Sequence, residues 1–213
     1  MVKTVGISKA ITNLNEVHNK FNLTQTTTPD FFTEWFENLP ELTDNEKASL
    51  NRLKSRYLYY AADGAITEGT VNVIMLSPFL ELMGLCDPPF KIKSEELVKV
   101  ELQNGGEEEI ILEGFIDALV VQNRFWVVLI ESKRFGFSVM QAIPQTLTYM
   151  MANPNLERPI FGMVTTGEDY LFIKLNQQQS LYALSNKFTL SNPQRNELYD
   201  VMQVMKRIVS LYL

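Results

Sequence analysis

The sequence predicts a single α/β domain in which helices flank a mixed central β-sheet. Apolar residues recur at helical spacing in the first half of the chain, short β-branched runs separated by turn residues fill the middle, and an apolar helical stripe returns at the end. The 213 residues, 46% hydrophobic and 21% charged, suit one globular domain able to bury a core. We expect residues 1–66 to form an N-terminal helical elaboration packed on a core of residues 67–213.

Two helices are expected in the N-terminal region. The stretch from Ile7 to Phe21 is a weak and polar helix candidate. Thr43 is followed three residues later by Glu46, which is the capping-box pattern of a helix N-terminus. The helix that follows carries an apolar face made of Leu50, Leu53 and Tyr57.

A further helix is predicted from Glu68 to about Met83, with Thr67 as its N-cap. Pro78 lies inside this stretch, and because proline has no backbone N–H to donate, we expect a kink there. The apolar stripe of the helix consists of Val71, Met75, Phe79 and Leu82.

The middle of the chain is expected to form an antiparallel meander of three strands, at Leu97 to Leu102, Ile110 to Val121 and Phe125 to Lys133. Gly105-Gly106 is a turn signal between the first two strands. Residues 122–124 are short enough for a tight connection between the last two, which makes this pair a hairpin.

The last third combines further strands with two helices. A helix is expected within Ser138 to Ala152, with its regular part beginning near Ile143 so that Pro144 falls in the first turn. Asn192-Pro193 marks the start of a final helix. The strands between these helices are predicted at Pro159 to Thr165, Tyr170 to Leu175 and Leu181 to Leu184.

The composition excludes several kinds of chemistry. A lone cysteine, Cys86, leaves no internal disulfide framework and no multi-cysteine zinc site. A single histidine, His18, excludes zinc sites with several histidine ligands, and the sequence has no Gly-x-x-x-x-Gly-Lys-Ser/Thr phosphate loop. What remains is carboxylate, lysine and metal chemistry.

The charge and hydropathy of the chain bear on location and partners. No apolar run of 18 residues indicates a transmembrane helix, and the N-terminus is too polar for a secretory signal, so we expect a cytoplasmic protein without membrane contact. The net charge is −6 and the pI is about 5.0. Because proteins that coat DNA alone are usually basic, nucleic-acid contact should be local or helped by another chain.

Three charged residues interrupt the apolar hairpin. Because side chains alternate across a strand, Glu131 and Lys133 are expected on one face with Val127 and Leu129, roughly 7 Å apart at the backbone. The hairpin turn places Asp117 almost opposite Glu131. An ionised group in an apolar run is costly without a partner or a metal, so we expect these three side chains to converge.

Such a set can carry metal-assisted phosphodiester hydrolysis. Asp117 and Glu131 would hold Mg²⁺ or Mn²⁺, which keeps open positions for a phosphate oxygen and a water. Lys133 would orient or deprotonate that water, or stabilise the developing charge.

The motifs Gly-Phe-Ile-Asp at 114–117, Glu-Ser-Lys at 131–133 and Gln-x-x-x-Tyr at 145–149 resemble the PD-(D/E)xK nuclease superfamily. The likeness is greatest to the nuclease domain at the N-terminus of type I restriction enzyme R subunits, and it covers roughly Thr67 to Lys174. It implies a restriction-endonuclease-like fold with 67–213 as the nuclease-like core. Ile116 stands where many members have proline, and no helicase or translocase motif follows in the 213 residues.

Carried over residue by residue, the resemblance makes Asp117 and Glu131 metal ligands and Lys133 the catalytic lysine. Gln145 joins this catalytic set. Gln145 and Tyr149 lie one helical turn apart and would position the nucleic acid or the active site.

Members of the superfamily often add a glutamate from the first core helix. Glu68 is our choice for this further metal ligand, and Glu81 is the competitor. A carboxylate at a helix N-terminus is also favourable without any metal, so Glu68 has a structural explanation as well. Tyr149 could equally be a core aromatic. The basic cluster Arg52, Lys54 and Arg56 could contact phosphates or form a solvated helix face.

The sequence therefore predicts a Mg²⁺- or Mn²⁺-dependent nuclease that hydrolyses phosphodiester bonds, with DNA as the favoured substrate. A homodimer or a partner protein would supply further DNA contact. The alternative is a catalytically idle nuclease-fold domain acting as a nucleic-acid-binding or protein-assembly module. A third alternative is a structural domain unrelated to nucleases, in which the acidic pair is only salt-bridged.

Overall fold

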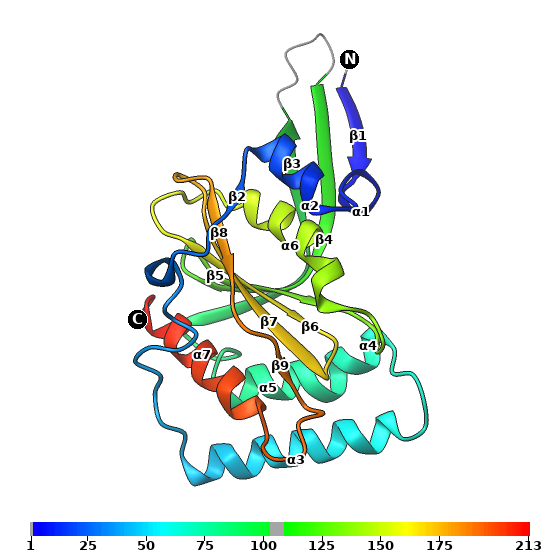
Figure 1. Ribbon diagram of the computed structural model, residues 1–213, viewed down its shortest axis with the longest axis vertical. Coiled ribbons are helices and arrows are strands. Elements are labelled where there is room, and N and C mark those ends of the chain that lie inside the picture. The colour runs from blue at the N-terminus through cyan, green and yellow to red at the C-terminus, as the bar shows by residue number, and fades with distance from the viewer. Residues whose placement is uncertain (1, 103–108) are drawn as a thin grey trace.

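The computed structural model describes residues 2–102 and 109–213. In these residues nine strands form one sheet in the order β1-β4-β5-β6-β7-β8-β2, with β3 paired to β4 and β9 paired to β7. The sheet is mixed, because β1 with β4, β5 with β6 and β2 with β8 are parallel pairs and the others are antiparallel. The predicted mixed α/β architecture is confirmed (Figure 1).

The chain contains runs of strands and runs of helices. The strands are β1 (Val2–Gly6), β2 (Thr24–Gln25), β3 (Phe90–Leu102), β4 (Glu109–Gln122), β5 (Phe125–Ser132), β6 (Ile160–Thr165), β7 (Asp169–Asn176), β8 (Leu181–Leu184) and β9 (Phe188–Thr189). The helices are α1 (Ile7–Ala10), α2 (Leu14–Phe21), α3 (Asp44–Ala61), α4 (Glu68–Val71), α5 (Ser77–Leu82), α6 (Val139–Met151) and α7 (Leu198–Ser210), with a short 3-10 turn η1 (Pro29–Phe31) and a π-turn η2 (Asn72–Leu76).

Two hydrophobic clusters cover the two faces of the sheet. The first cluster buries side chains of α3, α4, α5 and α7 against the sheet, and the second buries those of α1, α2 and α6. Figure 1 shows the same division, with α3, α5 and α7 on one side of the strands and α6 with α1 and α2 on the other. Among the described residues, no helix has both the length and the apolar character needed to cross a bilayer.

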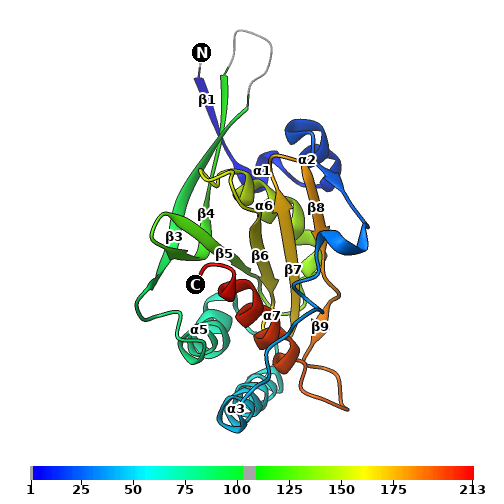
Figure 2. The same ribbon diagram turned by 90° about the vertical axis from the view of Figure 1, so that its left-hand side faces the viewer.

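Strand β4 organises the sheet because it has three partners. Along one edge it pairs with β3. On the other edge its first part pairs with β1 as far as Glu113, and its last part pairs with β5 from Ala118 onward. Residues 114–117 lie between these two pairings. Figure 2 shows β1, β3 and the start of β4 extending together beyond the rest of the sheet.

The predicted strands in the middle and last third agree well with β4 to β8. The expected strand at Leu97 to Leu102 is longer, because β3 begins at Phe90. Strands β1, β2 and β9 were not predicted, so the N-terminal region adds strands to the sheet as well as helices. The turn expected at Gly105-Gly106 lies outside the described residues.

Most predicted helices are present. The capping box is confirmed, since Glu46 N donates to Thr43 Oγ1 at 3.3 Å and Thr43 N donates to Glu46 Oε2 at 2.8 Å. The helix predicted from Glu68 is continuous through α4, η2 and α5, and the π-turn just before Pro78 adapts the helix to a residue without an N–H.

Two predicted helix starts are wrong. Helix α6 begins at Val139 rather than near Ile143, so Pro144 lies inside it. The Met140 carbonyl then lacks its usual donor, but Met140 is 50% exposed and water can take that place. Helix α7 begins at Leu198 rather than at Asn192-Pro193. Asn192 Oδ1 accepts from Gln194 N at 2.9 Å, and this local turn competes with a helix.

Candidate active site

Asp117 lies where β4 and β5 separate. The last backbone pair of the hairpin joins Ala118 to Ile130. Beyond it, Asp117 Oδ2 accepts from Ser132 N at 2.7 Å and from Ser132 Oγ at 3.0 Å. A carboxylate thus continues the strand pairing in place of the main chain. The expected hairpin is confirmed, and it brings Asp117 beside Glu131.

One part of the predicted strand alternation is wrong. Val120 pairs with Val128 and Val121 pairs with Trp126, so Val127 is an extra residue in β5, a β-bulge. Val127 and Val128 both pack in the first cluster, whereas Leu129 packs in the second. Val127 therefore does not share the face of Leu129. The bulge precedes Glu131 and Lys133 and leaves their mutual position unchanged.

Glu131 is the most deeply buried acid of the site, with 1% of its surface exposed. Lys133 Nζ donates to Glu131 Oε1 at 2.5 Å, while Glu131 Oε2 is buried without a hydrogen-bond partner in the described structure. Burial raises the pKa of Glu131 to about 8, the Asp117 charge adds to this rise, and Lys133 partly offsets it. A buried carboxylate with one free oxygen can accept a cation or a proton.

Lys133 remains an ammonium group in this setting. Its burial lowers the pKa, but the Glu131 charge and hydrogen bond outweigh burial and the net pKa is raised. The backbone is fixed as well, because Lys133 N donates to Thr165 O at 2.7 Å. A lysine held in this way is a hydrogen-bond donor and a positive charge at neutral pH, and a poor general base.

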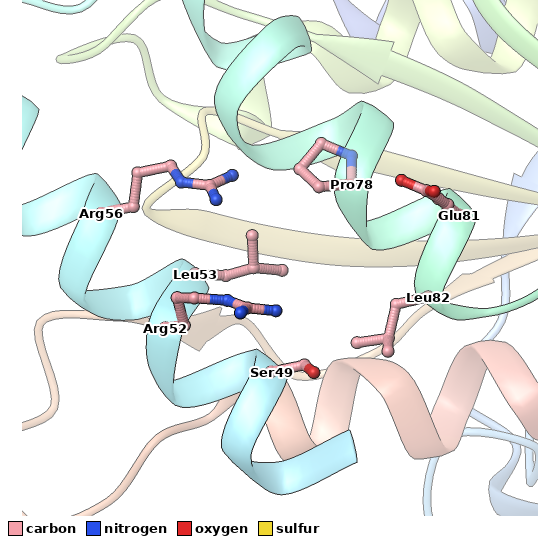
Figure 3. Close-up of a pocket in the computed structure, with 7 residues that line it drawn as sticks. All are labelled: Ser49, Arg52, Leu53, Arg56, Pro78, Glu81 and Leu82. Carbon is pink, nitrogen blue, oxygen red and sulfur yellow. The ribbon is translucent and has the colours of Figure 1, made fainter. Parts of the chain in front are cut away.

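Of the two candidate helix glutamates, the structure brings Glu68 toward Asp117. Both residues line one groove of about 450 Å³. Burial raises the pKa of Glu68, the Lys133 charge lowers it and the Asp117 charge raises it further. The charges of Lys133 and Asp117 are therefore close enough to act on Glu68. Glu81 lines a different pocket, shown in Figure 3, together with Arg52 and Arg56.

The same groove contains a further carboxylate that the sequence did not single out. On β3, Ser94 pairs with Ala118 and Glu96 pairs with Ile116, which places Glu95 opposite Asp117. Glu95 also lines the groove and has a φ of 51°, unusual for a residue within a strand. The register of the β3–β4 pair was the signal needed to find it, and β3 was predicted to begin only at Leu97.

The predicted metal ligands lie in one region of the described structure but do not form a group of three residues that could hold a metal ion. In the described parts of the chain, no three His, Cys, Asp or Glu residues form a group able to hold a metal ion. Asp117 and Glu131 nevertheless fit a hydrated divalent cation, because Mg²⁺ commonly uses only one or two carboxylates and keeps several waters. The unpartnered Oε2 of Glu131 is the atom that such a cation would satisfy.

Gln145 and Tyr149, both on α6, lie behind the carboxylates on the buried side of the site, and we call this side the wall of the site. Gln145 Nε2 donates to Tyr149 Oη at 2.6 Å, and Tyr149 is 3% exposed. A Cβ added at Gly114 would lie 2.8 Å from Tyr149 Cε1, so the glycine of the Gly-Phe-Ile-Asp motif makes room for the ring. Burial and then the Glu131 charge raise the pKa of Tyr149, which keeps its hydroxyl protonated. Its burial suits positioning of the site better than direct contact with a large ligand.

Comparisons with known proteins add little to this geometry. No family model matches the chain, and no curated protein matches its sequence. The fold is similar to a solved fragment assigned to the HsdR subunit of a type I restriction enzyme from Vibrio vulnificus YJ016, with 18% identity and a TM-score of 0.42. The match covers 64% of this chain and 26% of that one. A likeness of this size says nothing about activity.

Proposed function

We propose that the chain is a metal-dependent nuclease of restriction-endonuclease-like fold, hydrolysing phosphodiester bonds with DNA as the favoured substrate. The observation that carries the proposal is the convergence of Asp117, Glu131 and Lys133 at the point where β4 and β5 separate. Charges are costly in so buried a place, and a cation-binding role for the two acids accounts for that cost. Glu68 borders the same region from α4.

Asp117 and Glu131 would hold Mg²⁺ or Mn²⁺, with Glu68 as the third acid nearby. When bound, such a cation polarises a phosphate oxygen and acidifies water.

The other roles belong to the protein itself. Ser132 fixes the Asp117 carboxylate through two hydrogen bonds, and Lys133 fixes one oxygen of Glu131. The remaining N–H groups of Lys133 would donate to a phosphate oxygen and stabilise the negative charge that develops there. Gln145 and Tyr149 would keep the wall behind these groups rigid.

One observation favours a second candidate function, a catalytically idle nuclease-fold domain that binds nucleic acid or another protein. Lys133 Nζ already occupies Glu131 Oε1, an oxygen that a cation could otherwise bind. With a net charge of −6, DNA contact would be local or helped by a second copy or a partner protein.

The deciding experiment combines calorimetric titration of Mn²⁺ with a DNA and RNA cleavage assay, on the native chain and on Asp117→Asn. The matched control is Asp169→Asn, because Asp169, the first residue of β7, forms its ion pair with Lys187 and not with a residue of the site. Cation binding and cleavage that are both lost in Asp117→Asn, and retained in the control, support the nuclease. Cation binding without cleavage of any nucleic acid favours the second candidate. Absence of both binding and cleavage contradicts the nuclease.

A further inference from the structure

A second pocket lies between α3 and α5, apart from the carboxylate groove. Its volume is about 380 Å³, and it shares no lining residue with the groove. Figure 3 shows the residues that surround it, which are Ser49, Arg52, Leu53, Arg56, Pro78, Glu81 and Leu82.

The charge of this pocket is dominated by two arginines. Arg52 and Arg56 lie one turn apart on α3, so they occupy the same helix face. Figure 3 shows both guanidinium groups directed into the space between the two helices. In the described part of the chain, the arginine ion pairs are those of Arg195, so Arg52 and Arg56 have no carboxylate in salt-bridge contact, although Glu81 borders the pocket. Two like charges side by side are unfavourable unless an anion joins them.

The position of Arg56 is fixed by the helix opposite. Pro78 has no N–H and cannot donate to the Ile74 carbonyl four residues before it. Arg56 Nη1 donates to this carbonyl at 3.1 Å instead. One arm of the guanidinium is therefore anchored to backbone, and the rest faces the pocket beside Pro78. Lys54, the third member of the basic cluster, is used differently, because its Nζ donates to the carbonyls of Asn192 and Arg195 at 2.9 and 3.0 Å.

We infer that the pocket between α3 and α5 binds a phosphate group through Arg52 and Arg56. Guanidinium groups match the geometry of phosphate oxygens, and Arg56 is held in place before a ligand arrives. The Ser49 hydroxyl offers a further donor, and the side chains of Leu53 and Leu82 form the apolar part of the lining. This inference is independent of the proposed nuclease activity, because it uses none of the residues of that site.

The first test measures binding of inorganic phosphate by calorimetry at low ionic strength. Arg52→Gln should weaken binding about tenfold, as expected for loss of one charge-assisted hydrogen bond. Lys47→Gln is the matched control, since it removes one positive charge from the same helix outside the pocket. Glu81→Gln should bind phosphate more tightly than the native chain, a gain that damage to the fold would not produce.

A second measurement distinguishes a nucleic-acid backbone from a small phosphate compound. DNA binding is followed in EDTA, without cleavage, as a function of salt concentration. If the pocket contacts a DNA phosphate, Arg52→Gln should reduce the slope of log affinity against log salt by about 0.9, and Lys47→Gln should leave it unchanged. Phosphate binding that depends on Arg52 without an effect on DNA assigns the pocket to a small phosphate compound. No phosphate binding by the native chain, or equal affinities for Arg52→Gln and Lys47→Gln, overturns the inference.

Discussion

Two buried lysine–glutamate pairs in this fold have similar N–O distances and different surroundings. Lys133 and Glu131 form one pair, and Lys174 and Glu34 form the other, with an N–O distance of 2.6 Å and side chains that are 12% and 11% exposed. In both pairs one glutamate oxygen is buried without a partner. An unpartnered buried oxygen is therefore not enough to mark a functional site.

The difference lies in the neighbours. Lys174 Nζ lies 5.6 Å from the ring centroid of Phe31 and 5.7 Å from that of Phe161, so aromatic rings help to hold its charge. The Glu131 pair instead has further acids nearby, Asp117 and Glu68, which raise its pKa. Extra negative charge around a buried acid destabilises the metal-free protein, and a bound cation would offset that cost. This contrast distinguishes a candidate metal site from a structural ion pair.

The largest expected effect is on catalysis. Lys133→Ala should reduce Mg²⁺-dependent DNA cleavage by about 10²- to 10³-fold, because it removes a preorganised donor from the charged centre. Lys174→Ala removes the other buried lysine and should leave the cleavage rate of the folded protein near that of the native chain. Cleavage rates under single-turnover conditions test this, and equal losses in the two variants would remove the distinction between the pairs.

The loss of folding stability should follow the opposite order, larger for substitution of Lys174 than of Lys133. Lys174→Met leaves the Glu34 carboxylate buried and uncompensated, which should cost about 3–5 kcal/mol of unfolding free energy. Lys133→Met should cost less at pH 7, because Glu131, with its pKa raised to about 8, holds a proton at that pH and leaves no buried charge without a partner. Urea unfolding of both variants measures the difference. A larger loss in Lys133→Met than in Lys174→Met would contradict this account of the two environments.

The pH dependence of stability sharpens the comparison. The pKa of Glu131 rises from 4.5 to about 8 on folding, so between these values the folded state holds a proton that the unfolded state has lost. Raising the pH through this window should therefore lower the stability of the metal-free protein, by up to about 1.4 kcal/mol per pH unit from this group. Glu131→Gln should remove that contribution and Glu34→Gln should not. Urea midpoints from pH 5 to pH 8 in EDTA provide the test.

A smaller effect is expected at Gly114, which packs against Tyr149 in the wall of the site that contains Glu131 and Lys133. Gly114→Ala would place its Cβ 2.8 Å from Tyr149 Cε1 and 2.9 Å from Tyr149 Oη, which should cost about 1–3 kcal/mol. Gly69→Ala is the control, since nothing lies within 4 Å of a Cβ there. Thermal unfolding compares the two variants. Adding Tyr149→Phe should recover part of the loss in Gly114→Ala, and no recovery would show that the hydroxyl contact is unimportant.

The parts of the fold that depend on local pattern could be predicted from the sequence. Alternation and turn residues gave the β4–β5 hairpin, and the hairpin gave the convergence of Asp117 with Glu131 and Lys133. Parallel strand β1 could not be found in the same way, because its partner is distant in sequence and Val2–Gly6 is too short to show a period.

Other features of the site could be found only from the structure, because they depend on which strand residues lie opposite one another. Ser132 lies between the two charged residues of Glu-Ser-Lys, and it holds Asp117 through both its N–H and its hydroxyl. Glu95 reaches the groove because β3 extends beyond the predicted strand. Neither role follows from residue type alone, since each depends on which backbone lies alongside.

Strand β4 joins the two hydrophobic clusters, because Ala118 and Val120 pack in the first and Leu119 and Val121 in the second. Disruption of either cluster would thus release the strand that carries Asp117. Amide hydrogens of residues 118–121 should then exchange with solvent only when the entire molecule opens. Heat or denaturant should abolish the geometry of the candidate site together with global structure, leaving no partly unfolded form that retains one without the other.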